Sequence, residues 1–234
     1  MQPQKPMLRG LKDGLPICLG YFAVSFAFGI QAAAAGLTPL QAGLLSLTNL
    51  TSAGQFAGLG VILQSGSYLE MAFVQLVINL RYLLMSAALS QKLSPATGTP
   101  ARMGVAFGVT DEIFAVSIGQ KGLLDPRYSY ALTAISTLGW TLGTVLGATA
   151  GAILPAKLTS ALGVALYGMF IAVFVPPAFE KRSVAAAVLG AMALSTLLTY
   201  APGLRAISGG MRIILVTVLV AAFCAWRWPV KEDA

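Results

Sequence analysis

Long apolar runs, separated by prolines and short polar stretches, follow one another along the whole chain. Of its 234 residues, 57% are hydrophobic and only 10% are charged, whereas a soluble domain is about 45–50% apolar and about 25% charged. A chain this short cannot bury so much apolar surface in a core, so lipid must cover it. The sequence therefore predicts an all-α, polytopic membrane helix bundle that forms a single integral membrane domain over residues 1–234.

The apolar runs can be divided into eight segments, each close to the roughly 20 residues that a helix needs to cross the hydrocarbon layer. Prolines mark most of the boundaries, because proline is tolerated in the first turn of a helix and ends helices elsewhere. The predicted segments are 15–36, 40–63, 68–91, 103–120, 128–154, 159–178, 183–200 and 207–228.

Segment 103–120 is short and carries Asp111 and Glu112 at its middle, so its crossing needs a separate argument. The positive-inside rule places most Lys and Arg residues in the cytoplasm. If the segment crosses and the N-terminus is cytoplasmic, nine of these residues lie inside and five outside; otherwise six lie inside and eight outside. The rule favours about eight crossings with both termini cytoplasmic, and seven crossings with one re-entrant segment are the alternative.

Four glycines of the fifth segment recur at intervals of four residues: Gly139, Gly143, Gly147 and Gly151. Such a ridge lets a second helix approach closely, and packing is the main interpretation. Close approach of a substrate is the alternative. An even division into halves 1–125 and 126–234 would match the internal repeats found in many transporters.

Polar side chains gather at the middle of the second and third segments, where lipid should exclude them. Thr48, Ser52 and Gln55 are spaced to share one helical face, and a second polar stripe follows the third segment. Interhelical hydrogen bonds of about 0.6 kcal/mol each would explain some of them, but their density favours a cavity. We predict a substrate path lined by Thr48, Asn49, Ser52, Gln55, Gln75, Asn79, Arg81, Tyr82 and Ser86.

Arg81 lies near the centre of the third segment, where a charged side chain costs about 2.5–3.5 kcal/mol on insertion scales. Asp111 and Glu112 in the next segment supply partners at a similar depth. One arginine neutralises one carboxylate, so the second acid would stay protonated or titrate, as proton coupling requires. We predict that these three residues form a charge pair and a proton-coupling group. An ion pair that only fixes helix register is the alternative.

Other classes of function are disfavoured. The chain has no histidine, and its two cysteines, Cys18 and Cys224, lie in apolar segments at opposite ends. The sequence therefore predicts no catalytic or metal site, no cofactor and no enzymatic activity. The net charge of +7 comes from Lys and Arg residues scattered between apolar runs, which is not the pattern of a nucleic-acid-binding surface.

Several short stretches over residues 12–116 resemble the AzlC family, the large subunit of bacterial branched-chain amino-acid exporters. They are 12–17 (KDGLPI), 26–29 (FAFG), 36–39 (GLTP), 53–56 (AGQF), 79–81 (NLR) and 107–115 (FGVTDEIFA). Tyr82 and Met85 depart from the family, where histidine and tyrosine are usual. Both flank the suspected cavity.

The resemblance implies a permease in the bacterial inner membrane that exports valine, leucine or isoleucine, with methionine as a further candidate. It also implies a small AzlD-like membrane subunit as a partner. The chain has no phosphate-binding glycine loop, so ATP drive would need another protein. We expect secondary export, with proton coupling through the second acid. A non-transporting scaffold subunit, whose polar core only specifies helix pairing, is the alternative function.

Overall fold

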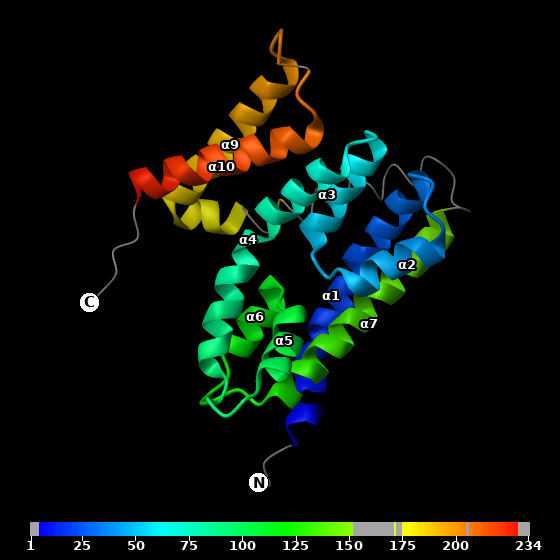
Figure 1. Ribbon diagram of the computed structural model, residues 1–234, viewed down its shortest axis with the longest axis vertical. Helices are drawn as coiled ribbons and strands as arrows, with labels where there is room; N and C mark the ends of the chain where they lie inside the picture. The colour runs from blue at the N-terminus through cyan, green and yellow to red at the C-terminus, as the bar shows by residue number, and fades with distance from the viewer. Residues whose placement is uncertain (1–4, 152–170, 172–174, 205, 229–234) are drawn as a thin grey trace. The chain divides into compact units, whose positions relative to one another are not determined.

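The computed structural model describes residues 5–151, 171, 175–204 and 206–228. Its elements are α-helices (Figure 1), of which five are long and apolar enough to cross a membrane, which confirms a polytopic helical membrane protein. The helices are α1 (Pro6–Ala34), α2 (Pro39–Thr48), α3 (Ser52–Leu63), α4 (Tyr68–Lys92), α5 (Thr99–Phe107), α6 (Asp111–Ile118), α7 (Pro126–Gly151), α9 (Arg182–Tyr200) and α10 (Gly209–Arg227).

These helices form two compact units. The first contains Met1–Gln55 and Asn79–Gly163, and the second contains Phe56–Ile78 and Val164–Ala234. Helix α4 contributes residues to both units. The predicted span 159–178 lies largely outside the described residues, whereas α9 and α10 match the predicted segments 183–200 and 207–228 to within two residues.

Helices α1 and α7 run side by side and parallel through the first unit (Figure 1). The glycine ridge of α7 lies against the backbone of α1: a Cβ atom added at Gly147 would lie 2.0 Å from the carbonyl oxygen of Phe26, and one at Gly139 would lie 2.3 Å from that of Cys18. Only glycine permits so close an approach of two helix backbones. The predicted packing role of the ridge is confirmed.

Helix α1 begins nine residues before the predicted start. Pro16 therefore lies inside the helix, not at its edge, while Pro6 occupies the first turn. The predicted segment 15–36 thus begins later than the helix, because the polar residues before it continue the helix beyond the apolar run.

The second predicted segment is interrupted at its middle. Helix α2 ends at Thr48, Asn49 has extended backbone angles (φ −140°, ψ 101°), and α3 begins at Ser52. The hydroxyl of Thr51 accepts a hydrogen bond from the amide of Gly54 at 3.2 Å and so caps α3. The predicted helical face shared by Thr48, Ser52 and Gln55 is therefore not formed.

The fourth predicted segment is interrupted in the same way. Helix α5 ends at Phe107 and α6 begins at Asp111, with Thr110 as its extended N-cap residue (φ −125°, ψ 173°). The hydroxyl of Thr110 accepts from the amide of Ile113 at 3.3 Å. With nine and eight residues, neither helix is long enough to cross a membrane.

Both ends of the α5–α6 pair meet the same end of the first unit. In the first turn of α5, the guanidinium of Arg102 donates to the carbonyl oxygen of Ser94 at 2.8 Å, just beyond the end of α4. At the last residue of α6, the carbonyl oxygen of Ile118 accepts from the Lys92 ammonium. The amide of Leu124 then donates to the carbonyl oxygen of Lys92 at 2.8 Å. The two ends of the pair thus lie together beside the end of α4, so residues 103–120 form a helical hairpin and not the single continuous helix that was predicted.

In the second unit, Glu70 lies at the N-terminus of α10. Its carboxylate accepts from the hydroxyl of Ser208, and the amide of Gly209 donates to Gln64 Oε1 at 3.0 Å. A carboxylate is stabilised there by the positive end of the helix dipole. Glu70 therefore helps to hold the start of α10 in place.

Candidate functional site

Tyr21 of α1 connects to the acidic N-terminus of α6. Its hydroxyl oxygen lies 2.6 Å from Thr110 Oγ1 and 2.6 Å from Glu112 Oε2. Tyr21 is only 8% exposed, whereas Glu112 is an exposed residue. The capping geometry of Thr110 fixes where α6 begins and thereby places Glu112 within reach of the phenol.

Arg81 of α4 forms an ion pair with Asp111 of α6, with 2.9 Å between Nη2 and Oδ2. The guanidinium also lies over the ring of Tyr82, 5.1 Å from its centroid. The two charged side chains are 46% and 43% exposed on the chain by itself. Because Arg81 neutralises Asp111, the site has one further carboxylate, Glu112, and a net charge of −1 when all three groups are ionised.

A buried polar network extends from the same region toward α2. Trp140 Nε1 of α7 donates to Gln55 Oε1 at 2.8 Å, and the Gln55 amide donates to Ser46 Oγ at 3.2 Å. Ser46 Oγ in turn lies 2.7 Å from Thr144 Oγ1. These four residues are at most 2% exposed. The network therefore fixes the first turn of α3 against α7.

Tyr21 and Trp140 stand between the two helix interruptions. Their rings pack edge to face, with centroids 5.3 Å apart and an interplanar angle of 75°. Leu50, within the first interruption, packs in the same cluster. Tyr21 then bonds to Thr110 at the second interruption. Two aromatic side chains thus connect the two places where the helical backbone is broken.

Asn79 of α4 joins the first interruption to the charged part of the site. Its Oδ1 accepts a hydrogen bond from the hydroxyl of Thr51 at 2.6 Å. Arg81 follows two residues later and bonds to Asp111. The middle of α4 therefore contacts the N-cap of α3 through Asn79 and the first residue of α6 through Arg81.

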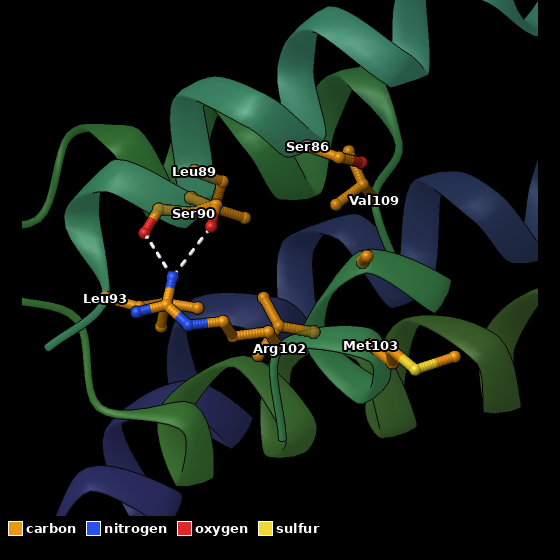
Figure 2. A pocket seen from close by; sticks show the side chains of 9 residues that line it. Ser86, Leu89, Ser90, Leu93, Arg102, Met103 and Val109 are labelled. Carbon is orange, nitrogen blue, oxygen red and sulfur yellow. Dashed lines mark hydrogen bonds between the residues drawn. The ribbon is translucent and has the colours of Figure 1, made fainter. Parts of the chain in front are cut away.

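A pocket of about 180 Å³ lies between the C-terminal part of α4 and α5, and it includes Ser86 (Figure 2). Arg102 lines it, but its guanidinium already donates to Ser90 Oγ at 2.7 Å and to the carbonyl oxygens of Ser90, Ser94 and Thr97. The remaining lining is mainly apolar. Because the guanidinium already donates to backbone carbonyl oxygens, we interpret the residues of this pocket as a structural contact that attaches α5 to the end of α4.

The structure brings together many of the predicted path residues within the first unit, but not as the expected helical stripes. Gln55, Asn79, Arg81, Asp111 and Glu112 lie on the connected contacts described above. Thr48 instead bonds back to the carbonyl oxygen of Leu44 at 2.8 Å. Gln75 belongs to the second unit, with its amide nitrogen 3.9 Å from Met71 Sδ.

Sequence reasoning missed Tyr21, Trp140, Ser46 and Thr144 as members of this network. Tyr21 and Trp140 each follow a glycine, Gly20 and Gly139, and this pairing was the available signal. Serine and threonine inside apolar segments carry little information by themselves, because they can bond to their own helix backbone.

The described residues contain no group of three or more His, Cys, Asp or Glu side chains that could hold a metal ion. What they contain is a neutral ion pair, an additional carboxylate with hydroxyl partners, and a buried hydrogen-bond network at two broken helices. Broken helices are characteristic of substrate and ion sites in secondary transporters. The fold and the site thus define a polytopic helical membrane protein with a polar site at two broken helices.

Comparison with known proteins identifies the family. The AzlC protein family matches residues 16–154, so the chain belongs to the AzlC family. It is 30% identical to the inner membrane protein YgaZ of Escherichia coli over 235 residues, covering 96% of this chain and 94% of that protein. It is also 34% identical over 184 residues to an uncharacterized membrane protein of Archaeoglobus fulgidus, covering 78% and 80% of the two chains. No solved structure matches.

Proposed function

We propose that this protein is the large subunit of a secondary exporter of the branched-chain amino acids valine, leucine and isoleucine, with the unbranched methionine as a further substrate. Membership of a family of membrane proteins and the mid-helix polar site both support this function. The observation that carries it is the position of Glu112, a carboxylate beside an already neutral Arg81–Asp111 pair. Such a group can take up a proton during each transport cycle.

Coupling follows from one carboxylate serving two cations. Ionised Glu112 attracts either a proton or the ammonium group of an amino acid, and the two cannot occupy it together. Proton entry on one side of the membrane would then release the amino acid, and substrate binding on the other would displace the proton. Mutually exclusive occupancy of this kind gives antiport, which is what proton-driven export requires.

The substrate path combines Glu112 with the amides and hydroxyls at the first interruption. Asn79 and Thr51 are near the N-terminus of α3, where backbone amides favour a carboxylate. An amino acid would place its ammonium group toward Glu112 and its carboxylate toward this end, with its aliphatic side chain against apolar residues. Arg81 forms an ion pair with Asp111 and so holds α4 against α6.

We further propose six crossings, two re-entrant segments and cytoplasmic termini. Helix α4 ends beside the start of α7, which lies beside Gly10 of α1. If α4 crosses the membrane once, it ends at the face where α1 begins. Residues 39–63 then enter and leave the membrane at the opposite face. With 159–178 as a crossing, Lys and Arg divide eleven to three. Inside are Lys5, Arg9, Lys12, Lys92, Arg102, Lys121, Arg127, Lys181, Arg182, Arg227 and Lys231, and outside are Lys157, Arg205 and Arg212. This asymmetry follows the positive-inside rule better than eight crossings do.

The partner in this proposal is a small AzlD-like membrane subunit, and the location is the bacterial inner membrane. The partly exposed Arg81, Asp111 and Glu112 side chains are expensive to leave against lipid. Water in a transport cavity would solvate them, and a second subunit that completes this cavity would lower the cost further.

The test is counterflow of labelled valine, leucine, isoleucine and methionine in proteoliposomes that contain the full chain, with and without the small subunit. Exchange that saturates, and efflux that responds to an imposed pH gradient, would support the exporter. A chain that assembles with its partner but neither binds nor exchanges any of the four amino acids would instead support a scaffold role for the polar core.

A further inference from the structure

The hydroxyl of Tyr21 is placed to respond to the charge of Glu112. The ring is held on one side by Trp140, at 5.3 Å between centroids, and packs with Leu50 in the same buried cluster. Only 8% of the residue is exposed. Its hydroxyl oxygen, at the end of a fixed ring, lies 2.6 Å from oxygens of both Thr110 and Glu112.

Counting protons gives the direction of these hydrogen bonds. Tyr21 and Thr110 have one hydroxyl proton each, and an ionised Glu112 has none. If Tyr21 donates to the carboxylate, Thr110 must donate to Tyr21, while Thr110 accepts from the amide of Ile113. The chain of bonds then runs from the backbone of α6 through Thr110 and Tyr21 to Glu112. When Glu112 gains a proton, it can donate to Tyr21, and the order reverses.

We propose that Tyr21 is a positioning residue for Glu112, which holds the ionised carboxylate in place and communicates its protonation to the Thr110 cap of α6. This inference rests on the proposed function, since it assigns Glu112 the coupling role. A hydrogen bond to the charged form favours that form. Tyr21 therefore holds the ionised carboxylate in place and links it to the start of a broken helix.

The other ionisable groups around Glu112 do not supply this bond. Asp111 interacts electrostatically with both Glu112 and Arg81, and Tyr21 interacts with both Glu112 and Tyr82. Arg81 is bonded to Asp111 at 2.9 Å and lies over Tyr82. Asp111 repels the charge on Glu112. Tyr21 is therefore the group whose removal takes a donor from the carboxylate.

The variant Tyr21→Phe tests the proposal because the ring keeps its packing against Trp140 and only the hydroxyl is lost. The measurement is the initial rate of valine exchange at a series of pH values in proteoliposomes. We expect the pH profile of the variant to differ from that of the wild-type protein, because the ionised carboxylate loses one hydrogen-bond donor.

The matched control is Tyr130→Phe, which removes a hydroxyl that donates to the carbonyl oxygen of Ala101 at 2.9 Å. It should leave the pH profile unchanged. A second readout does not depend on transport: infrared difference spectra report the carboxyl band of Glu112 as pH is varied, with Glu112→Gln used to assign the band. Tyr21→Phe should move this band, because the carboxylate loses the hydrogen bond from the phenol.

The outcomes separate the two proposals. If the wild-type protein exchanges no amino acid, the exporter is wrong, and the infrared titration still decides the role of Tyr21. If the wild-type protein exchanges valine but both the pH profile and the carboxyl band of Tyr21→Phe match it, Tyr21 does not position Glu112. If Tyr130→Phe shifts the profile equally, loss of any phenol near these helices explains the effect, and the proposal fails.

Discussion

Arg81 and Asp111 form an ion pair at 2.9 Å across α4 and α6, although thirty positions separate them in the chain. The pair requires that α6 begin at Asp111, which in turn depends on the Thr110 cap. A continuous helix through residues 103–120 would orient the two acids differently. The interruption of the helix thus determines which carboxylate the arginine neutralises and which one remains.

The ion pair can be tested with a charge reversal. Arg81→Ala leaves Asp111 without its cation, and Asp111→Ala leaves Arg81 without its anion; each should destabilise the protein by about 2.5–3.5 kcal/mol, the cost of a central charge on insertion scales. The charge-swapped double variant, Arg81→Asp with Asp111→Arg, should recover part of this loss. Thermal unfolding in detergent measures the stability of each variant. If the effects of the two single changes simply add in the double variant, the two side chains are not energetically coupled.

Glu112→Gln should abolish efflux driven by a pH gradient. The amide keeps the size of the side chain and can still meet Tyr21, but it does not take up a proton. Any residual counterflow should become independent of pH. Gradient-driven valine efflux measures the effect, with Glu180→Gln as the control because Glu180 is an exposed acid of the second unit. Normal coupling in Glu112→Gln would remove this residue from the mechanism.

Two Gly→Ala changes should have opposite effects, one at the α1–α7 contact and one at an open position of α9. At Gly147 a new Cβ would lie 2.0 Å from the carbonyl oxygen of Phe26, so the helices must separate, at a cost of about 1–3 kcal/mol. At Gly190 of α9 there is nothing within 4 Å of the new Cβ. Alanine there should be neutral or stabilise the helix by up to about 1 kcal/mol. Melting temperatures of the two variants would distinguish these effects.

The long helices and the glycine ridge could be predicted from the sequence because both depend on local pattern. Apolar runs define α4, α7, α9 and α10 to within a few residues, and four-residue spacing of glycines indicates a packed face whatever the partner. The identity of that partner, α1, could not be predicted, because spacing along one helix says nothing about which other helix lies against it.

The two interruptions could not be predicted, because nothing in the residues at the breaks forbids a helix. Asn49 and Gly108 are tolerated within helices, and Thr51 and Thr110 become caps only when the backbone turns. Tertiary hydrogen bonds stabilise the two interrupted helices: Gln55 bonds to Trp140, and Thr110 bonds to Tyr21. The expected pairing of Arg81 with an acid did not depend on that detail, since any charge at this depth needs a partner.

The re-entrant hairpin gives the most direct test of the proposed topology. Thr97 lies between α4 and α5, and it would be extracellular if 40–63 and 103–120 both crossed the membrane. With two re-entrant segments it is cytoplasmic, and Ser65, between α3 and α4, is extracellular. A single cysteine at each position, in a background with Cys18 and Cys224 replaced by serine, can be labelled in intact cells with an impermeant maleimide. We expect Ser65→Cys to react and Thr97→Cys to react only after the membrane is opened. The reverse pattern would restore eight crossings, because each re-entrant segment that became a crossing would exchange the sides of the loops that follow it.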